Sequence, residues 1–168
     1  MKKILIVLSV VFMLFLLYLG ILIVDSYVEF DLSYELFYAK LDIELERNTD
    51  AVKMHQPLFG SDLIKVINST NELCEYTVIS NYDDEYFKNN ALVLIYVERS
   101  SGSHKVIPTE VKVENNKMTV KYEVYHPEVG TCDMAYWYIF VECSKEEAAN
   151  LDKIVVYGGL TKVGELTK

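Results

Sequence analysis

The residues best suited to covalent chemistry are the three cysteines, Cys74, Cys132 and Cys143. A cysteine nucleophile needs a base within hydrogen-bond reach, and His104 or His126 would have to serve Cys132, but the sequence gives no sign of that geometry. If Cys132 and Cys143 flank one extended strand, they lie roughly 36 Å apart, against the ~7 Å between Cα atoms that a disulfide tolerates. We therefore expect three thiols, some of them buried, while a disulfide from Cys74 to either of the others stays open.

A second candidate is the run of Ser101, Gly102, Ser103 and His104. A serine beside a histidine superficially resembles part of a serine hydrolase site. The chain has no G-x-S-x-G elbow, however, and a Ser/Gly turn between two strands explains the composition. These four residues are taken as candidate binding residues, and no catalytic residue is predicted.

The histidines and the acidic residues do not form a metal-binding pattern. His55, His104 and His126 lie far apart, and none has a cysteine, histidine or carboxylate at metal-ligand spacing. The acidic run at 83–85 lacks the alternation of a calcium-binding loop, and it suits the start of a helix through the helix dipole. No metal ion and no cofactor is predicted.

Composition and charge narrow the classes of partner. The chain has 168 residues, of which 51% are hydrophobic, enough for one domain with a genuine core. Its formal net charge is −9, from 25 acidic and 16 basic residues. Such a surface repels nucleic acid, so no nucleic-acid partner is predicted.

The N-terminus carries an apolar run at 4–24 behind Lys2 and Lys3. A helix over this run spans about 31 Å, close to the roughly 30 Å hydrocarbon core of a bilayer. We therefore predict an uncleaved anchor at 1–26, with the lysines on the cytoplasmic side and the rest of the chain outside the cytoplasm. The alternative is a signal peptide that is cleaved after Ser26, which would release a secreted protein.

The part that follows the anchor is predicted as a stalk and linker over 27–62 and a folded domain over 63–168. Alternation of apolar and polar residues favours a strand near 37–45, although helical spacing also fits there. Residues 47–62, with Pro57 and Gly60, indicate a loop.

Within the domain the patterns predict several strands and short helices. A strand at "LIKVI" precedes a capping box at 69–72 and a helix over roughly 70–79, and an acid-led helical turn then leads into a central strand at 91–98. The strand at "KVIPTEVKVE" carries Pro108, which places it at an edge or a bulge.

The second half of the domain continues this pattern. A tight hairpin at 115–117 leads into a strand of alternating polarity, "MTVKYEVYH". A capped helix at 144–151, a last strand in "KIVVYGGL" and a frayed polar tail complete the chain. The predicted class is α+β, a mostly antiparallel sheet with two or three short helices, preceded by an N-terminal transmembrane helix.

The aromatic stretch before Cys143 is predicted to be a strand. Ala135, Trp137, Ile139, Val141 and Cys143 share one face. The other face holds Tyr136, Tyr138 and Phe140, which would be binding residues if exposed or core residues if they pack beneath the helix at 70–79.

Four stretches resemble, in order, the layout of PrcB-like protease-complex subunit domains: "LIKVINSTNEL", "YFKNNALVLIYVERSSGSHKV", "VENNKMTVKYEVYHPEVGT" and "AYWYIFVECSKEE". The resemblance covers residues 63–156, and the T-G-G-Y turn of that family falls on residues 101–104. It implies a secreted or anchored accessory subunit of a surface protease complex, with no catalytic residues in the module.

The expected function is therefore that of a membrane-anchored extracytoplasmic binding or accessory module that is not an enzyme. Its partners would be the membrane, through residues 4–24, and a protein at the cell surface. One alternative is a structural or sensor ectodomain without an enzyme partner. Another is an envelope hydrolase that uses Cys132 or Ser103.

Overall fold

The computed structural model describes residues 45, 47–54, 64–77 and 81–167, together with Leu16 and Tyr18. Contacts divide the chain into two compact units, 1–40 and 41–168. Of the first unit only Leu16 and Tyr18 are described, and both are helical and exposed. The strands described below all belong to the second unit.

Sheet A is antiparallel and has the strand order β1-β6-β3-β2. It consists of β1 (Thr49–Met54), β2 (Ile64–Ile67), β3 (Asn90–Arg99) and β6 (Ala135–Ser144). β3 and β6 are the two central strands and pair along their whole length, from Asn90 opposite Ser144 to Arg99 opposite Ala135.

Sheet B is mixed and has the strand order β4-β5-β7-β8. It consists of β4 (Lys105–Glu114), β5 (Lys117–Tyr125), β7 (Lys153–Gly158) and β8 (Thr161–Thr167). β7 runs parallel to β5, and the other neighbouring strands are antiparallel. The short helix α3 (Lys145–Asn150) connects β6 of sheet A to β7 of sheet B.

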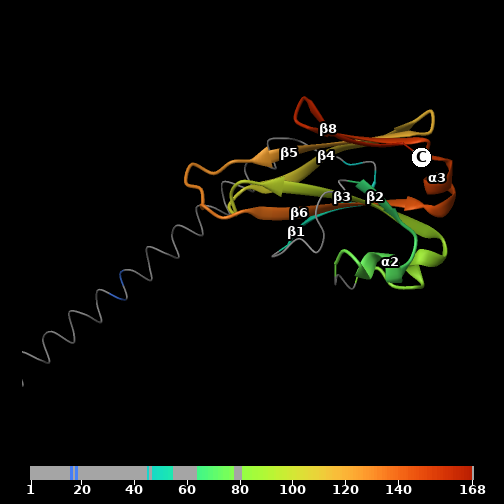
Figure 1. Cartoon of the computed structure of the whole chain (residues 1–168), viewed down its shortest axis with the longest axis horizontal. Coiled ribbons are helices and arrows are strands. Elements are labelled where there is room, and N and C mark those ends of the chain that lie inside the picture. Colours follow the sequence, from blue (N-terminus) through green and yellow to red (C-terminus); the bar gives the residue numbers. More distant parts are fainter. Residues whose placement is uncertain are drawn as a thin grey trace, which may run out of the picture. The chain divides into compact units, whose positions relative to one another are not determined.

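The two sheets pack face to face, and sheet B lies above sheet A in Figure 1. Alternate residues of β6 point into the space between the sheets, among them Trp137, Ile139 and Val141. From sheet B they meet Met118 and Val120, which are fully buried. This inter-sheet core is the arrangement expected for two sheets that each present one apolar face.

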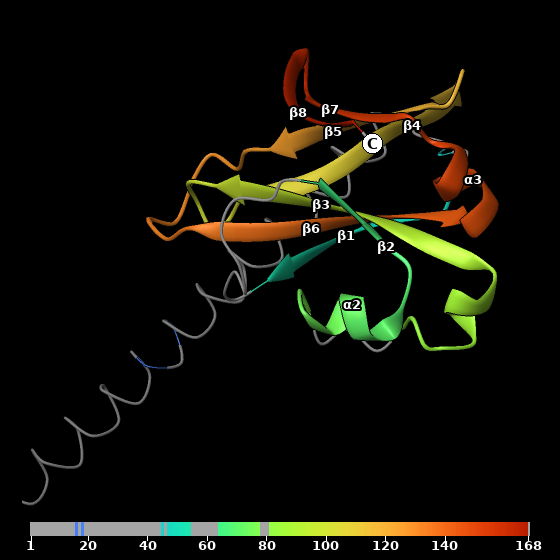
Figure 2. The same cartoon turned by 45° about the vertical axis from the view of Figure 1, so that its right-hand side comes forward.

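A second core covers the opposite face of sheet A. There α2 (Thr70–Cys74) and the 3₁₀ turn η1 (Tyr86–Lys88) contribute Leu73 and Phe87. Figure 2 shows α2 on the side of sheet A that faces away from sheet B. Sheet A is therefore covered on both faces, which explains why its central strands are so apolar.

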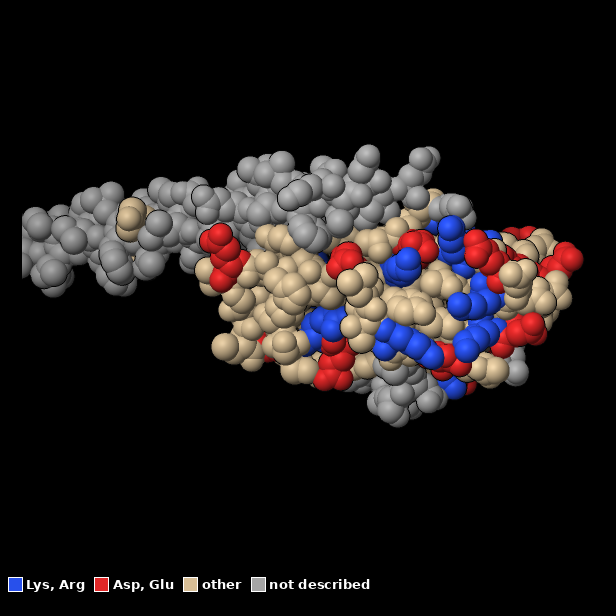
Figure 3. All heavy atoms as spheres, turned by 90° about the horizontal axis from the view of Figure 1, so that it is seen from above, with Lys and Arg blue, Asp and Glu red and all other residues tan. Residues whose placement is uncertain are grey.

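The outer face of sheet B carries mixed charge. Seen from above this sheet, basic and acidic side chains are interspersed over the surface (Figure 3). Lys121 pairs with Glu110 at 2.9 Å, and Lys153 pairs with Glu165 at 2.7 Å. Because acidic and basic side chains are neighbours there, this face has no large patch of a single charge.

The predicted α+β class is wrong, because the described structure is mainly β: eight strands form two packed sheets. The two α-helices in the described part of the second unit are only five and six residues long. The helix predicted over 70–79 ends at Cys74, so it contributes one turn rather than a layer. Two segments that were predicted to be irregular are strands, which shifts the balance further.

The first of these segments is the predicted loop over 47–62, which contains β1 paired with β6. The second is the predicted frayed tail, which forms β8. Gly159, at φ +60°, lies in the turn that reverses the chain, and β8 then pairs with β7. Both are edge strands, held on one side only, and such strands carry a weak pattern because their outer residues face water.

Several other expectations are confirmed. β3 is a central strand, and β5 alternates between the inter-sheet core and the opposite face. Asn115 and Asn116 have φ of 50° and 59° in the tight hairpin between β4 and β5. Pro108 lies on an edge strand, next to a register shift.

Helix starts also follow the sequence. The Ser69 hydroxyl accepts a hydrogen bond from the Glu72 N–H, and the Ser144 hydroxyl accepts one from the Glu147 N–H. Two further predictions lie outside the described residues: the strand near 37–45, except for Leu45, which is not in a strand, and the membrane segment at 4–24, except for Leu16 and Tyr18. Among the residues that are described, no helix has the length and apolar character needed to span a bilayer.

Candidate binding site

The candidate site lies where two connections meet at one end of the sandwich. They are the β3–β4 turn, residues 100–104, and the β5–β6 loop, residues 126–134, and we call them the paired loops. The register places them together, because Arg99 lies opposite Ala135 and Lys105 lies opposite Tyr125. The β5–β6 loop projects at the left-hand end of the sandwich in Figure 1.

A chain of hydroxyl groups ties the two loops together. The Ser101 hydroxyl donates to the Thr131 carbonyl at 2.8 Å, and the Thr131 N–H donates to Ser103 Oγ at 3.0 Å. Ser101 Oγ and Ser103 Oγ are 2.8 Å apart. Since Ser101 has already given its one proton to Thr131, Ser103 must be the donor between the two serines. Both hydroxyl groups are thereby engaged in holding the loops.

A carboxylate and an ammonium group hold the middle of the turn. The Gly102 N–H donates to Asp133 Oδ1 at 3.0 Å, and the Lys53 ammonium group of β1 donates to the Gly102 carbonyl. A Cβ at Gly102 would overlap the Asp133 carboxylate, so the close approach requires glycine. Hydrogen bonds from the Thr131 side chain and the Gly102 amide, with the Lys53 charge, hold the pKa of Asp133 below its usual value.

A pair of histidines closes the exposed side of the paired loops. His104 Nε2 lies 3.1 Å from His126 Nδ1, and the ring centroids are 4.3 Å apart in an edge-to-face arrangement. His104 Nδ1 is buried and has no hydrogen-bond partner among the described residues. A buried N–H without an acceptor is costly, so the favoured tautomer of His104 carries its proton on Nε2 and donates it to His126.

The electrostatic surroundings favour an uncharged His104. Burial, the neighbouring His126 and the Arg99 guanidinium lower the pKa of His104 below its ordinary value. Arg99 is the last residue of β3, and it donates to the Tyr122 hydroxyl at 2.5 Å. Gly158 leaves the space that the Tyr122 ring occupies, because a Cβ there would lie 2.8 Å from the hydroxyl oxygen.

Apolar side chains are exposed on the β5–β6 loop. Val129 is 84% exposed and Met134 is 46% exposed. Cys132 is also exposed, between Thr131 and Asp133. The loop therefore exposes apolar side chains while its backbone is held by Ser103 and its neighbours.

The candidate residues on β6 lie elsewhere, on the face of sheet A that α2 covers. Tyr138 and Phe140 are buried with Leu73 and Phe87, and only Tyr136 is half-buried. The rings of Tyr138 and Phe140 meet edge to face, with centroids 6.2 Å apart. These two rings fill a core, and the structure does not bring them together with residues 101–104.

A stack of tyrosines extends this aromatic core. Tyr136 stacks on Tyr96 of β3 at 6.3 Å between ring centroids. Burial, together with the nearby Glu98 carboxylate, raises the pKa of Tyr96 to about 12. The Tyr96 phenol therefore stays protonated in the neutral pH range, and it offers packing surface and a neutral hydroxyl group.

All three cysteines are free thiols, as predicted. Cys74 and Cys132 are exposed, and Cys143 is buried with its sulfur 3.5 Å from the Ala91 carbonyl oxygen. Neither Ser103 nor Cys132 has a hydrogen bond to a histidine in the described structure. A nucleophile with an adjacent base is therefore not assembled among these residues.

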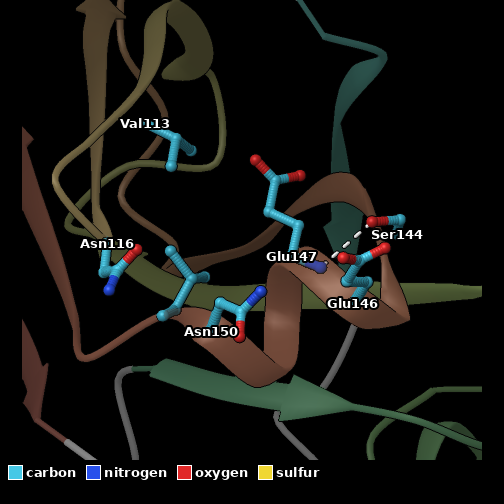
Figure 4. Close-up of a pocket in the computed structure, with 7 residues that line it drawn as sticks. Val113, Asn116, Ser144, Glu146, Glu147 and Asn150 are labelled. Atoms are coloured by element: carbon cyan, nitrogen blue, oxygen red, sulfur yellow. Dashed lines mark hydrogen bonds between the residues drawn. The ribbon is translucent and has the colours of Figure 1, made fainter.

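A separate cavity of about 360 Å³ lies beside α3. It is lined by Val113, Asn116, Ser144, Glu146, Glu147, Asn150 and Leu151, and Figure 4 shows these side chains around the start of the helix. Arg47 binds the Glu147 carboxylate through two hydrogen bonds of 2.6 and 2.5 Å, which neutralises one of the two acidic groups. The remaining lining combines polar side chains with the apolar Val113 and Leu151, and no chemistry is assigned to this cavity.

Sequence patterns missed most of the residues that build the paired loops. Lys53, His126, Thr131 and Asp133 act through partners 22 to 49 residues away, so no local motif marks them. The turn at 101–104 was recognised, but not its partner loop. His104 and His126 lie 22 residues apart in the sequence, and the fold brings them into contact. Within the described part of the chain, no group of three possible metal ligands is present.

Comparisons with models of protein families, with curated proteins and with solved structures find no match for this chain. The resemblance to PrcB-like domains therefore stays a prediction.

Proposed function

We propose that this chain is a binding module whose paired loops recognise a protein partner outside the cytoplasm. The observation that carries the proposal is the exposure of Val129, 84%, on a loop that is hydrogen-bonded to the neighbouring turn. A loop that is already ordered loses little conformational entropy on binding, and an exposed apolar side chain gains from burial. Together they favour a surface that binds over one that is merely solvated.

The place of the module in the cell rests on the N-terminal sequence. The apolar run at 4–24, preceded by two lysines, supports a single membrane anchor with the sandwich on the outer side. Cleavage after Ser26 would instead release the same module as a secreted protein. In either case the partner is a protein at the cell surface.

The class of partner follows from the resemblance of residues 63–156 to PrcB-like domains. A module of that kind acts as an accessory subunit of a surface protease complex, so a protease is the partner that we propose first. A structural or sensor ectodomain remains the competing function, and a search for partners at the loops distinguishes the two.

A photo-crosslinking amino acid placed in the full-length chain tests the function in intact cells. One variant carries it at Val129, on the paired loops, and a matched variant carries it at Leu160, in the β7–β8 turn. Leu160 is 103% exposed against 84% for Val129, so the control probe is at least as available to solvent. The expected result is a discrete crosslinked protein from position 129 and none from position 160.

Two outcomes contradict the proposed function. Equal crosslinking from both positions would mean that contacts are non-specific. The absence of any crosslink at position 129, with the chain present at the cell surface, would favour the structural or sensor ectodomain.

A further inference from the structure

The contact between His104 and His126 can respond to pH, because it joins the paired loops through two side chains of variable charge. His104 ends the β3–β4 turn and His126 begins the β5–β6 loop. Their facing nitrogens are 3.1 Å apart, which fits one shared proton between two uncharged rings.

Acidification disrupts this arrangement for a definite reason. His104 is partly buried, and the more exposed ring of the pair is that of His126. Once protonated, its Nδ1 carries a hydrogen and no longer accepts the one from His104 Nε2. His104 could restore the bond only by moving its own proton to Nδ1, which is buried and lacks an acceptor among the described residues. The contact is therefore weakened either by the loss of the acceptor on His126 or by the cost of a buried N–H on His104.

The charges around the pair also affect how easily it is protonated. The ionisable groups on the elements that meet here include Lys53 of β1, Glu98 and Arg99 of β3, Lys105 of β4, Tyr122, Glu123 and Tyr125 of β5, and Glu128, Cys132 and Asp133 of the loop. Of these, the Arg99 guanidinium opposes a positive charge on His104. The Asp133 carboxylate accepts a hydrogen bond from the N–H of Gly102, which lies two residues before His104.

We propose that the His104–His126 contact is a pH-sensitive latch for the paired loops. With both rings uncharged it holds the β5–β6 loop against the β3–β4 turn, and in mildly acidic surroundings it opens and the loop loosens. Its effect on binding rests on the function proposed above: the module holds its protein partner near neutral pH and releases it on acidification.

The latch itself is tested without any partner, by hydrogen exchange of the Thr131 amide in the full-length chain in detergent micelles. This amide donates to Ser103 Oγ across the two loops, so it reports directly on their contact. Between about pH 7.5 and about pH 5, a range in which histidines titrate, its protection should fall. After correction for intrinsic exchange the expected loss is on the order of fivefold, the effect of one hydrogen bond.

Two variants and a second measurement define the outcomes. His126→Asn should show the lower protection at both pH values, whereas His55→Gln, which changes neither residue of the pair, should behave as the unmodified chain. Independently of the exchange measurement, NMR titration should place the pKa of His104 below its ordinary value, because burial, His126 and Arg99 all lower it. EDTA is present throughout, so that a metal ion shared by the rings does not imitate the latch.

The latch is refuted if Thr131 protection is independent of pH in the unmodified chain, or if the pH effect persists in His126→Asn. The binding effect is read separately, as the crosslinking yield from position 129 at the two pH values. A yield that falls on acidification with unchanged Thr131 exchange also refutes the latch. No crosslink at either pH refutes the proposed function alone, since Thr131 exchange still reads the loops.

Discussion

The Thr131 N–H donates to Ser103 Oγ at 3.0 Å, across 28 residues of sequence. This bond joins the β3–β4 turn to the β5–β6 loop, and the Ser101 hydroxyl reinforces it through the Thr131 carbonyl. Two connections that would otherwise move independently therefore form one surface. The candidate site is a property of this junction rather than of either segment.

Replacing Ser101 by alanine should destabilise the fold. Ser101 is only 6% exposed, and its loss leaves the Thr131 carbonyl and the Ser103 hydroxyl without their partner. The expected cost is about 1–3 kcal/mol in the free energy of unfolding, measured by urea denaturation. The control is Ser100→Ala at the exposed neighbouring position, which should change stability by less than about 0.5 kcal/mol. Equal effects of the two substitutions would contradict the hydroxyl network.

Trp137 should be the most costly residue of β6 to truncate. Its ring lies in the inter-sheet core and is 8% exposed. Trp137→Ala should reduce the free energy of unfolding by about 3–5 kcal/mol. Trp137→Phe is the matched control, because the indole N–H has no hydrogen-bond partner among the described residues, and it should cost less than about 1.5 kcal/mol. A loss below about 1 kcal/mol for the alanine variant would show that the face assignment of β6 is wrong.

Gly158→Ala should disturb the hydrogen bond between Arg99 and Tyr122, which lies next to the paired loops. The added Cβ would lie 2.8 Å from the Tyr122 hydroxyl oxygen, so the Tyr122 ring must move and its hydrogen bond with Arg99 must lengthen. We expect a loss of about 1–3 kcal/mol in thermal or chemical denaturation. In the double variant with Tyr122→Leu the alanine should cost much less, because the clash is removed. Additive costs would rule out this contact as the cause.

The Glu165 carboxyl on β8 should titrate far below an ordinary glutamate. Hydrogen bonds from Lys153 and Lys162 lower its pKa from 4.5 to about 2. Because the pKa is lower in the folded state, this ion pair stabilises the fold above about pH 4.5, and its contribution is lost as the pH falls towards about 2. NMR titration of the side-chain carboxyl carbon measures the value directly, and Lys153→Gln should raise it. A titration near 4.5 in the unmodified chain would contradict the pairing.

Local patterns were sufficient for the elements whose signal lies within a few residues. The alternation in β5, the N-cap serines Ser69 and Ser144 and the Asn115–Asn116 turn all appear as the sequence predicted. Each depends on short-range sterics or on hydrogen bonds within one turn. The edge strands β1 and β8 escaped prediction because their pairing depends on partners that the local sequence does not reveal.

The sequence by itself determined that this chain has strongly apolar central strands, caps at its short helices, three cysteines with no metal-ligand spacing, and an apolar N-terminal run. Only the tertiary structure decided that the strands divide into two packed sheets, that Tyr138 and Phe140 are buried, and that His104 meets His126. The physical reason is range. Periodicity and capping act over a few residues, whereas the paired loops depend on β3, β5 and β6 bringing residues 22 to 31 positions apart into hydrogen-bond contact.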